Sequence, residues 1–191
     1  MSRDTATPEN TMPEIETDIA LVEEILLPWQ SALMADFLGY RNHVYRMLHF
    51  CFALHDCQGD DRDKFIIAAC HHDLGIWPEG VVDYLPPSIA LAKYYLDQKG
   101  QNEWQEEICL MIDMHHKIRA FKDPKYPLVE VFRQADLVDV SLGKIRKGIP
   151  KSYVNAVREA FPNAGFHKRL GELAWEQFKK HPLNPAPMMK W

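Results

Sequence analysis

Hydrophobic residues recur along most of this chain at the spacing of α-helices. The first helix, which we expect to end at Pro28, has an apolar face formed by Ile15, Ile19, Val22 and Leu26. The same period, with matching end signals, predicts further helices over residues 42–55, 62–72, 89–98, 103–118, 128–142, 151–161 and 164–180. No segment alternates convincingly as a half-buried strand would. The pattern therefore predicts an all-α protein, built as a single-domain helical bundle.

Polar and proline-rich segments flank the predicted helical domain, which we expect to cover residues 15–180. Residues 1–14 are polar and lack an apolar core segment, so we expect them to be disordered and to be neither a signal peptide nor a membrane anchor. Residues 181–191 form a proline-rich tail. Residues 76–87 are rich in proline, glycine and aromatics, which predicts an ordered loop that could roof a pocket, with Ser88 capping the next helix.

Composition narrows the class of protein. A chain of 191 residues with 47% hydrophobic content can build one sizeable core. The net charge of −5 and the lack of a basic run argue against a long nucleic acid as partner, but a small anionic substrate stays compatible. No run is long enough to span a bilayer. We expect reduced thiols in a cytoplasmic protein, because no CxxC spacing occurs among Cys51, Cys57, Cys70 and Cys109.

Several histidines and one aspartate occupy positions where a polar group is costly. His43 lies on the apolar face of its predicted helix, and Asp136 interrupts the apolar stripe of residues 128–142. The pair His72-Asp73 ends another helix. Burying an ionised carboxylate without a partner costs several kcal/mol. Each residue taken alone is more often a hydrogen-bonded core residue, but one divalent ion would satisfy several of them together.

The order of these residues resembles the signature of HD-superfamily metal-dependent phosphohydrolases. The matching blocks are Asn42-His43-Val44-Tyr45-Arg46-Met47, Ala69-Cys70-His71-His72-Asp73-Leu74-Gly75 and Ala135-Asp136-Leu137. The resemblance spans residues 38–145 and implies an HD-domain-like helical fold. It also implies a metal site whose ligands are His43, His72, Asp73 and Asp136.

Two of these assignments have a neighbour that competes for the same role. His71 points about a quarter turn away from His72 on a helix, so only one of them can lie beside Asp73. The register of the family favours His72. Asp139 lies three residues beyond Asp136 along the same stripe. The register favours Asp136, which leaves Asp139 behind the site or on the surface.

The adjacent residues His115 and His116 resemble the additional histidines with which some HD proteins hold a second metal. Those histidines are usually separated, and neighbours on a helix diverge, so we expect only one of this pair to reach the site, without choosing which. The alternative is one core histidine and one solvated histidine. Lys117 follows the pair and Arg46 lies one turn beyond His43, so either cation could contact a substrate anion, although such residues are more often solvated or paired.

Mixed histidine and aspartate ligation suits Mn, Fe, Ni, Co or Zn better than an all-oxygen Mg site. The resemblance implies a metal-activated water that hydrolyses a small phosphoester or nucleotide, with Asp73 as ligand and as the residue that orients the water. Two alternatives stay open: a dinuclear-iron oxygenase or hydratase of a small organic molecule, as some HD-fold proteins are, and a non-catalytic metal-containing helical sensor. Trp77 and Tyr84 either line the pocket or are ordinary packing residues.

Overall fold

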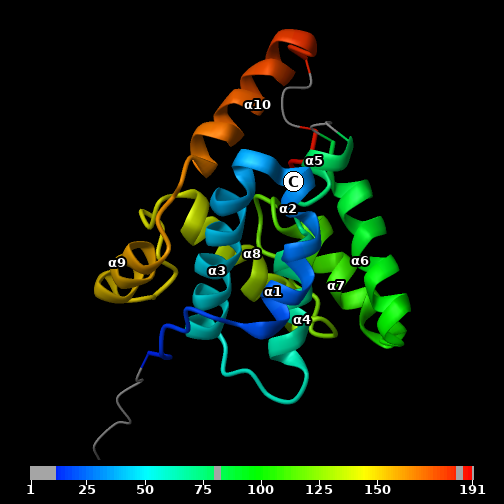
Figure 1. The fold of residues 1–191 in the computed structure, drawn as a ribbon. Helices are drawn as coiled ribbons and strands as arrows, with labels where there is room; N and C mark the ends of the chain where they lie inside the picture. Colours follow the sequence, from blue (N-terminus) through cyan, green and yellow to red (C-terminus); the bar gives the residue numbers. More distant parts are fainter. Residues whose placement is uncertain (1–11, 80–82, 184–186, 191) are drawn as a thin grey trace, which may run out of the picture.

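The computed structural model describes residues 12–79, 83–183 and 187–190, and over these residues the protein is a single helical bundle without a strand (Figure 1). The predicted all-α fold is confirmed. The chain enters through α1 (Ala20–Leu26), η1 (Leu27–Trp29), α2 (Gln30–Leu33) and η2 (Met34–Asp36). Pro28 does not end the helical path, because it lies in the first turn of a 3-10 helix, where its missing N–H loses no hydrogen bond.

The centre of the bundle is α3 (Phe37–Leu54), which packs against α8 (Pro127–Val140) and α4 (Asp61–His71). Every residue of α3 from Asn42 to Cys51 is buried. A helix that is buried all round must find partners for its polar side chains inside the protein. The polar residues of α3 are therefore candidates for a functional site inside the protein.

A second layer consists of α6 (Leu85–Lys99) and α7 (Gln105–Met114), which pack against each other and against α4 (Figure 1). The predicted loop is partly helical, because α5 (Ile76–Glu79) precedes residues 80–82, which lie outside the described residues. Prolines occupy the first turn of α6, so this helix begins before Ser88 and the predicted cap is wrong. Ser88 Oγ instead accepts a hydrogen bond from Gly75 N–H at 3.0 Å.

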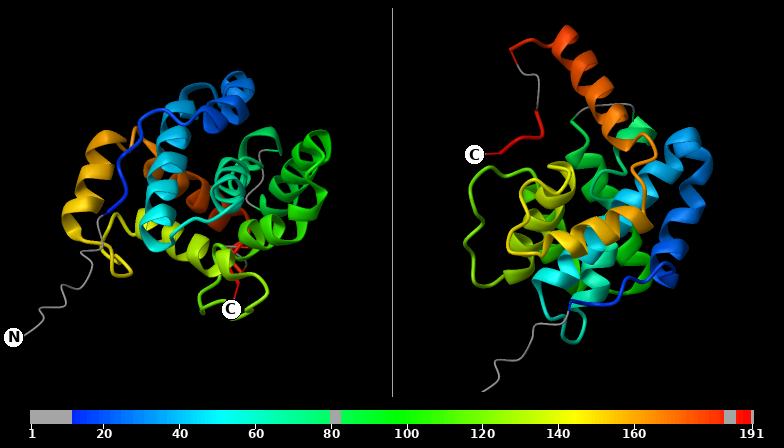
Figure 2. Two further views of the ribbon diagram at one scale, coloured as in Figure 1. Left: turned by 90° about the horizontal axis from the view of Figure 1, so that it is seen from below. Right: turned by 90° about the vertical axis from the view of Figure 1, so that its left-hand side faces the viewer.

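The C-terminal part adds α9 (Lys151–Ala160) beside α3, and then α10 (Phe166–Lys180), which extends away from the bundle (Figure 2). The tail residues 187–190 return to the body, where Ile118 N–H donates to Lys190 O at 2.8 Å and Lys190 Nζ pairs with Asp113. Residues 1–14 were predicted to be disordered, and residues 1–11 of this segment lie outside the described residues. Residues 184–186 and 191 of the predicted tail also lie outside them. No described helix is long and apolar enough to cross a membrane.

Candidate metal centre

Four parts of the fold bring histidines and aspartates to one place in the interior. They are α3, the turn after α4, the turn after α7, and α8. The side chains that meet there, called the His/Asp cluster below, are His43, His72, Asp73, His115, His116 and Asp136. Only His116 among them is partly exposed. The cluster is thus built from residues far apart in the sequence.

One half of the cluster joins His43 to His72 and Asp73. The Nε2 atoms of the two histidines lie 3.0 Å apart, and His72 Nε2 is 3.4 Å from Asp73 Oδ2. Asp136 Oδ1 approaches His43 Nε2 to 3.9 Å from α8. The three residues His43, His72 and Asp73 each offer a ligand atom within 4.8 Å of the others, so this group could hold a metal ion.

The other half joins Asp73 to His115 and His116. Asp73 Oδ1 lies 3.5 Å from His115 Nε2, and Asp136 Oδ2 lies 3.9 Å from His116 Nδ1. This group also has one ligand atom per residue within 4.8 Å of the others. Asp73 belongs to both groups through its two oxygens, and Asp136 faces both in the same way. The two groups therefore share their carboxylates.

The adjacent histidines both reach the cluster because the helix ends before them. The helix predicted over residues 103–118 is too long, because α7 ends at Met114. A turn follows, closed by a hydrogen bond that Lys117 N–H donates to Met114 O at 2.9 Å. In a turn, neighbouring side chains need not diverge as they do on a helix. The rings of His115 and His116 lie with their centroids 3.9 Å apart. Their expected divergence, and a solvated alternative for one of them, do not match this geometry.

Hydrogen bonds fix how the imidazoles present themselves to the cluster. In His43, His72 and His115 the Nδ1 atom faces an acceptor, so in the neutral ring Nδ1 carries the proton and the Nε2 lone pair is available to a metal ion. The acceptors are Asp139 Oδ2 for His43 (2.6 Å), Ala69 O for His72 (2.8 Å) and Ile112 O for His115 (2.7 Å). The lone pairs of His43 and His72 consequently face each other at 3.0 Å, which favours a cation between them.

Two buried atoms of the cluster lack a hydrogen-bond partner among the described residues: Asp73 Oδ1 and His115 Nε2. They face each other, but with the proton of His115 on Nδ1 neither atom can donate. A buried carboxylate with an unpartnered oxygen is costly and calls for a cation.

Arg46 and Asp139 form a buried ion pair behind His43. Arg46 Nε donates to Asp139 Oδ1 at 2.6 Å, and Nη2 donates to Oδ2 at 2.8 Å. Its Nη1 donates to Phe161 O at 3.0 Å. The guanidinium, 2% exposed, is thus engaged inside the protein, which does not match the expected contact of Arg46 with a substrate anion. Asp139 instead orients His43, a role that its position on the apolar stripe of α8 could have signalled.

His71 lies outside the cluster. His71 Nδ1 donates to Ile67 O at 2.7 Å, and its ring lies 5.4 Å from that of Tyr95 between centroids. Burial lowers the pKa of His71 to about 4, so it is a neutral core residue. Lys117 is half-buried in the turn after α7, and its carbonyl accepts Arg133 Nη1 at 3.0 Å.

A cavity of about 160 Å³ adjoins the cluster. Its lining residues are Asp73, Ile76, Tyr84, His116, Val140, Leu170, Leu173, Ala174 and Met188. Tyr84 therefore lines the pocket, and its hydroxyl lies 2.6 Å from His116 Nε2, a contact that the sequence did not signal. Trp77 packs 4.9 Å from Tyr40 between ring centroids and donates to Asp36, so it is a packing residue. Neither Arg46 nor Lys117 is a lining residue.

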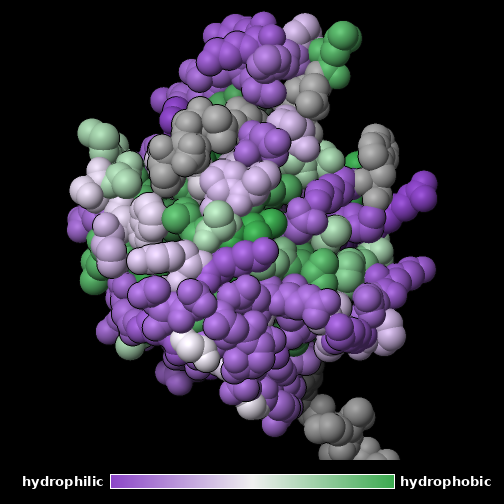
Figure 3. Space-filling model, turned by 90° about the vertical axis from the view of Figure 1, so that its right-hand side faces the viewer, coloured by the Kyte–Doolittle hydropathy of each residue, from purple (hydrophilic) through white to green (hydrophobic). Residues whose placement is uncertain are grey.

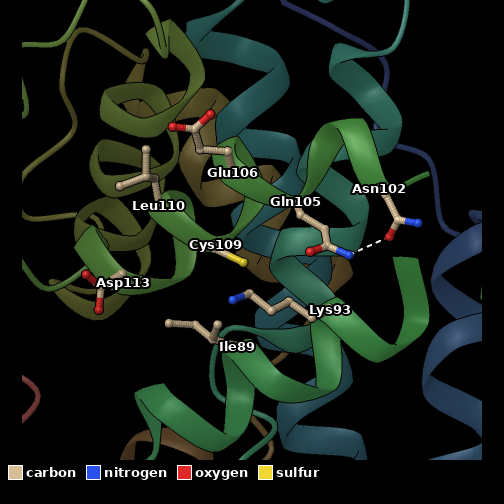
Figure 4. Close-up of a pocket in the computed structure, with 8 residues that line it drawn as sticks. All are labelled: Ile89, Lys93, Asn102, Gln105, Glu106, Cys109, Leu110 and Asp113. Carbon is tan, nitrogen blue, oxygen red and sulfur yellow. Dashed lines mark hydrogen bonds between the residues drawn. The ribbon is translucent and has the colours of Figure 1, made fainter. Parts of the chain in front are cut away.

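A larger groove of about 620 Å³ lies between α6 and α7 (Figure 4). Its walls carry scattered polar groups, and the amide of Gln105 donates to Asn102 Oδ1 at 2.5 Å. None of the clustered histidines lines this groove. Burial raises the pKa of the Cys109 thiol, which makes it a poor nucleophile. The groove is therefore larger than the cavity beside the cluster, but no residue of the cluster lines it.

Comparisons with protein families, with curated proteins and with solved structures gave no match to this chain. The likeness to the HD superfamily therefore rests on the three sequence blocks alone. The geometry itself supports a coarser statement: the protein is all-helical and contains buried histidine and aspartate groups that could hold a metal ion.

Proposed function

We propose that this protein is a metal-dependent hydrolase of the HD superfamily that cleaves small phosphoesters. One observation carries the proposal: three imidazoles turn Nε2 lone pairs into a space that two carboxylates also face. These groups are acceptors without a donor, and Asp73 Oδ1 and His115 Nε2 have no partner among the described residues. A divalent cation is the simplest group that satisfies all of them.

The first ion would be held by His43, His72, Asp73 and Asp136, the set that the resemblance implies. Mn, Fe, Ni, Co and Zn suit these nitrogen and oxygen donors better than Mg does. When bound, such an ion lowers the pKa of a bound water and offsets negative charge on a phosphoryl group. His115 and His116 offer donors for a second position that shares Asp73 with the first.

The residues of the chain would orient the donors and the attacking water. Asp139 keeps the proton of His43 on Nδ1, so that Nε2 stays free to ligate. His116 would donate from Nε2 to the Tyr84 hydroxyl and turn its Nδ1 toward Asp136. Asp73, as the carboxylate common to both groups, would accept a hydrogen bond from the water and direct its oxygen toward phosphorus.

The test is metal analysis of the purified protein, followed by a hydrolysis screen over nucleotides and small phosphoesters. His72→Gln and His71→Gln form a matched pair, because these neighbours are both buried and only His72 faces the cluster. We expect the His72 variant to lose metal and phosphate release, and the His71 variant to keep both. Wild-type protein that binds no first-row metal, or equal behaviour of the two variants, would contradict the proposal.

A dinuclear-iron oxygenase or hydratase is the second candidate, and one observation favours it. Both His115 and His116 reach the cluster, which gives more nitrogen and oxygen donors than one ion needs. Two iron ions per chain with a mixed-valence electron paramagnetic resonance signal, and no phosphate release from any ester, would support this candidate over the hydrolase. Bound metal without turnover of any substrate would favour a non-catalytic sensor.

A further inference from the structure

The cavity beside the His/Asp cluster differs from the cluster in chemistry. Its polar lining residues are Asp73, His116 and Tyr84, which lie toward the cluster. The rest of its wall is apolar and consists of Ile76, Val140, Leu170, Leu173, Ala174 and Met188. No lysine or arginine belongs to the lining within the described part of the chain. Phosphates beyond the first need such cations or backbone N–H donors, so this wall is unsuited to a polyphosphate or to a nucleoside di- or triphosphate.

We propose that this apolar cavity holds the organic group of the substrate, and that the enzyme acts on alkyl or aryl phosphomonoesters rather than on nucleotides. This inference rests on the proposed hydrolase function. The phosphate would face the cluster and the uncharged organic group would cover the apolar wall. Water forms the new bond to phosphorus, the ester P–O bond breaks, and the alcohol leaves with a proton taken from that water.

The volume of the cavity limits the size of the organic group. An apolar cavity of about 150 Å³ accommodates a benzene-sized molecule. The present cavity, at about 160 Å³, therefore suits a phenyl ring or a short alkyl chain. A nucleoside, with a base and a ribose, exceeds this space. Size and lining chemistry thus lead to the same class of substrate.

The wall is held in place from three directions. Leu170 and Leu173 come from α10 and pack with Ile76, Tyr84 and Leu85 in a small hydrophobic cluster of their own. Met188 comes from the tail, which is fixed to the body by the Ile118–Lys190 hydrogen bond and by the pairing of Lys190 with Asp113. Figure 1 shows α5, the start of α10 and the tail gathered at one end of the bundle.

The apolar character of this wall has an energetic consequence. Val140, on the rim, is 38% exposed. On the face drawn in Figure 3, hydrophobic surface gathers between two hydrophilic regions. Removing apolar surface from water stabilises a complex by about 25 cal/mol per Å², close to 0.8 kcal/mol for each CH₂ group. Each added CH₂ that enters the cavity should therefore tighten binding by about fourfold.

The experiment measures binding of non-hydrolysable phosphonates to the metal-loaded full-length protein by isothermal titration calorimetry. The probes are inorganic phosphate, methylphosphonate, butylphosphonate and phenylphosphonate, with adenosine monophosphate for comparison. We expect butylphosphonate and phenylphosphonate to bind at least about tenfold more tightly than methylphosphonate. Adenosine monophosphate should bind no more tightly than methylphosphonate, because its nucleoside does not fit.

Substitutions in α10 test whether the preference for longer probes arises in the cavity. Leu173→Trp fills the space, and Ala174→Phe fills it from the next position of the helix, in case the first variant folds poorly. Lys168→Trp is the matched control, because this side chain is 83% exposed on the same helix. We expect the two cavity variants to lose the preference for the longer probes while keeping metal and methylphosphonate binding. The control should behave as wild type.

The outcomes separate this inference from the function on which it rests. Phosphonates that bind equally well whatever their organic group, or a preference that survives Leu173→Trp and Ala174→Phe, would overturn the apolar-substrate inference and leave the hydrolase proposal standing. Failure of inorganic phosphate and of every phosphonate to bind the metal-loaded protein would overturn the phosphohydrolase proposal itself.

Discussion

Two buried polar groups adjoin each other where His43 contacts Asp139, and they differ in whether their hydrogen-bonding needs are met. The Arg46–Asp139 pair is satisfied within the protein, since both carboxylate oxygens accept bonds from the guanidinium and Phe161 O accepts another. The His/Asp cluster keeps unpartnered atoms at Asp73 and His115. A satisfied group serves the fold, whereas an unsatisfied one of this composition points to a ligand.

The same difference separates two carboxylates three residues apart on α8. Burial in the interior of the protein raises the pKa of Asp136. Burial acts on Asp139 as well, but hydrogen bonds from His43 and Arg46 outweigh it and hold the pKa of that carboxyl well below its usual value. Asp139 has its cation already, whereas Asp136 is still short of positive charge.

Asp73→Ala should have the largest effect, because it removes the carboxylate that both halves of the cluster share. We expect loss of bound metal, of all hydrolysis, and of the stabilisation that metal gives to the native state, which is about 4 kcal/mol at a thousandfold excess over Kd. The variant should stay folded. Thermal unfolding with and without EDTA measures this: the variant should unfold earlier than wild type only when metal is present. Wild-type turnover by the variant would make Asp73 a structural residue.

Asp139→Asn should weaken the protein in both conditions, which contrasts with Asp73→Ala. It leaves the Arg46 guanidinium buried without its counter-charge, and losing one partner of a buried pair costs about 3–5 kcal/mol. It also loosens the orientation of His43, so metal affinity should fall about 10–100-fold. Urea unfolding and metal titration measure the two effects. A variant as stable as wild type without metal would remove the distinction between the pair and the cluster.

Ser88→Ala tests a satisfied contact that lies near the cluster but carries no charge. The change leaves the buried Gly75 N–H without its acceptor, at a cost of about 1–3 kcal/mol in the free energy of unfolding. Metal affinity should stay at the wild-type value. Chemical denaturation and calorimetry report the two quantities, and a marked loss of metal would show that the turn holding His72 and Asp73 depends on this hydrogen bond.

Lys93→Ala, in the larger groove between α6 and α7, should have the smallest effect. A surface substitution of this kind changes stability by less than about 0.5 kcal/mol. Metal content, phosphonate binding and turnover should all equal those of wild type, because the groove has no residue of the cluster. A clear loss of phosphonate binding would move the substrate site to the groove.

The helices could be predicted from the sequence because the apolar face of each helix is a local pattern. The end of α7 could not, since no glycine or proline marks it in the sequence. The predicted helix extended four residues beyond the actual end of α7. His115 and His116 were therefore expected to diverge, although in the structure both reach the cluster.

The candidate site depended on more than local pattern. His43, His72, Asp73 and Asp136 were proposed from a resemblance, and the fold places them within 4 Å of a neighbour in the set. The role of Arg46 could not be predicted from the sequence, because its partner Asp139 lies 93 residues away along the chain. A cation on a helix gives no local sign of whether it meets a substrate or a buried carboxylate.

Calorimetric titration of EDTA-treated wild-type protein with Mn²⁺ tests the central claim most directly. We predict saturable binding of one or two ions per chain, because the Nε2 atoms of His43, His72 and His115 and the carboxylates of Asp73 and Asp136 face one space. The titrated protein should unfold at a higher temperature than the metal-free protein. Absence of both binding and stabilisation, with Mn²⁺ and with Zn²⁺, would contradict the account.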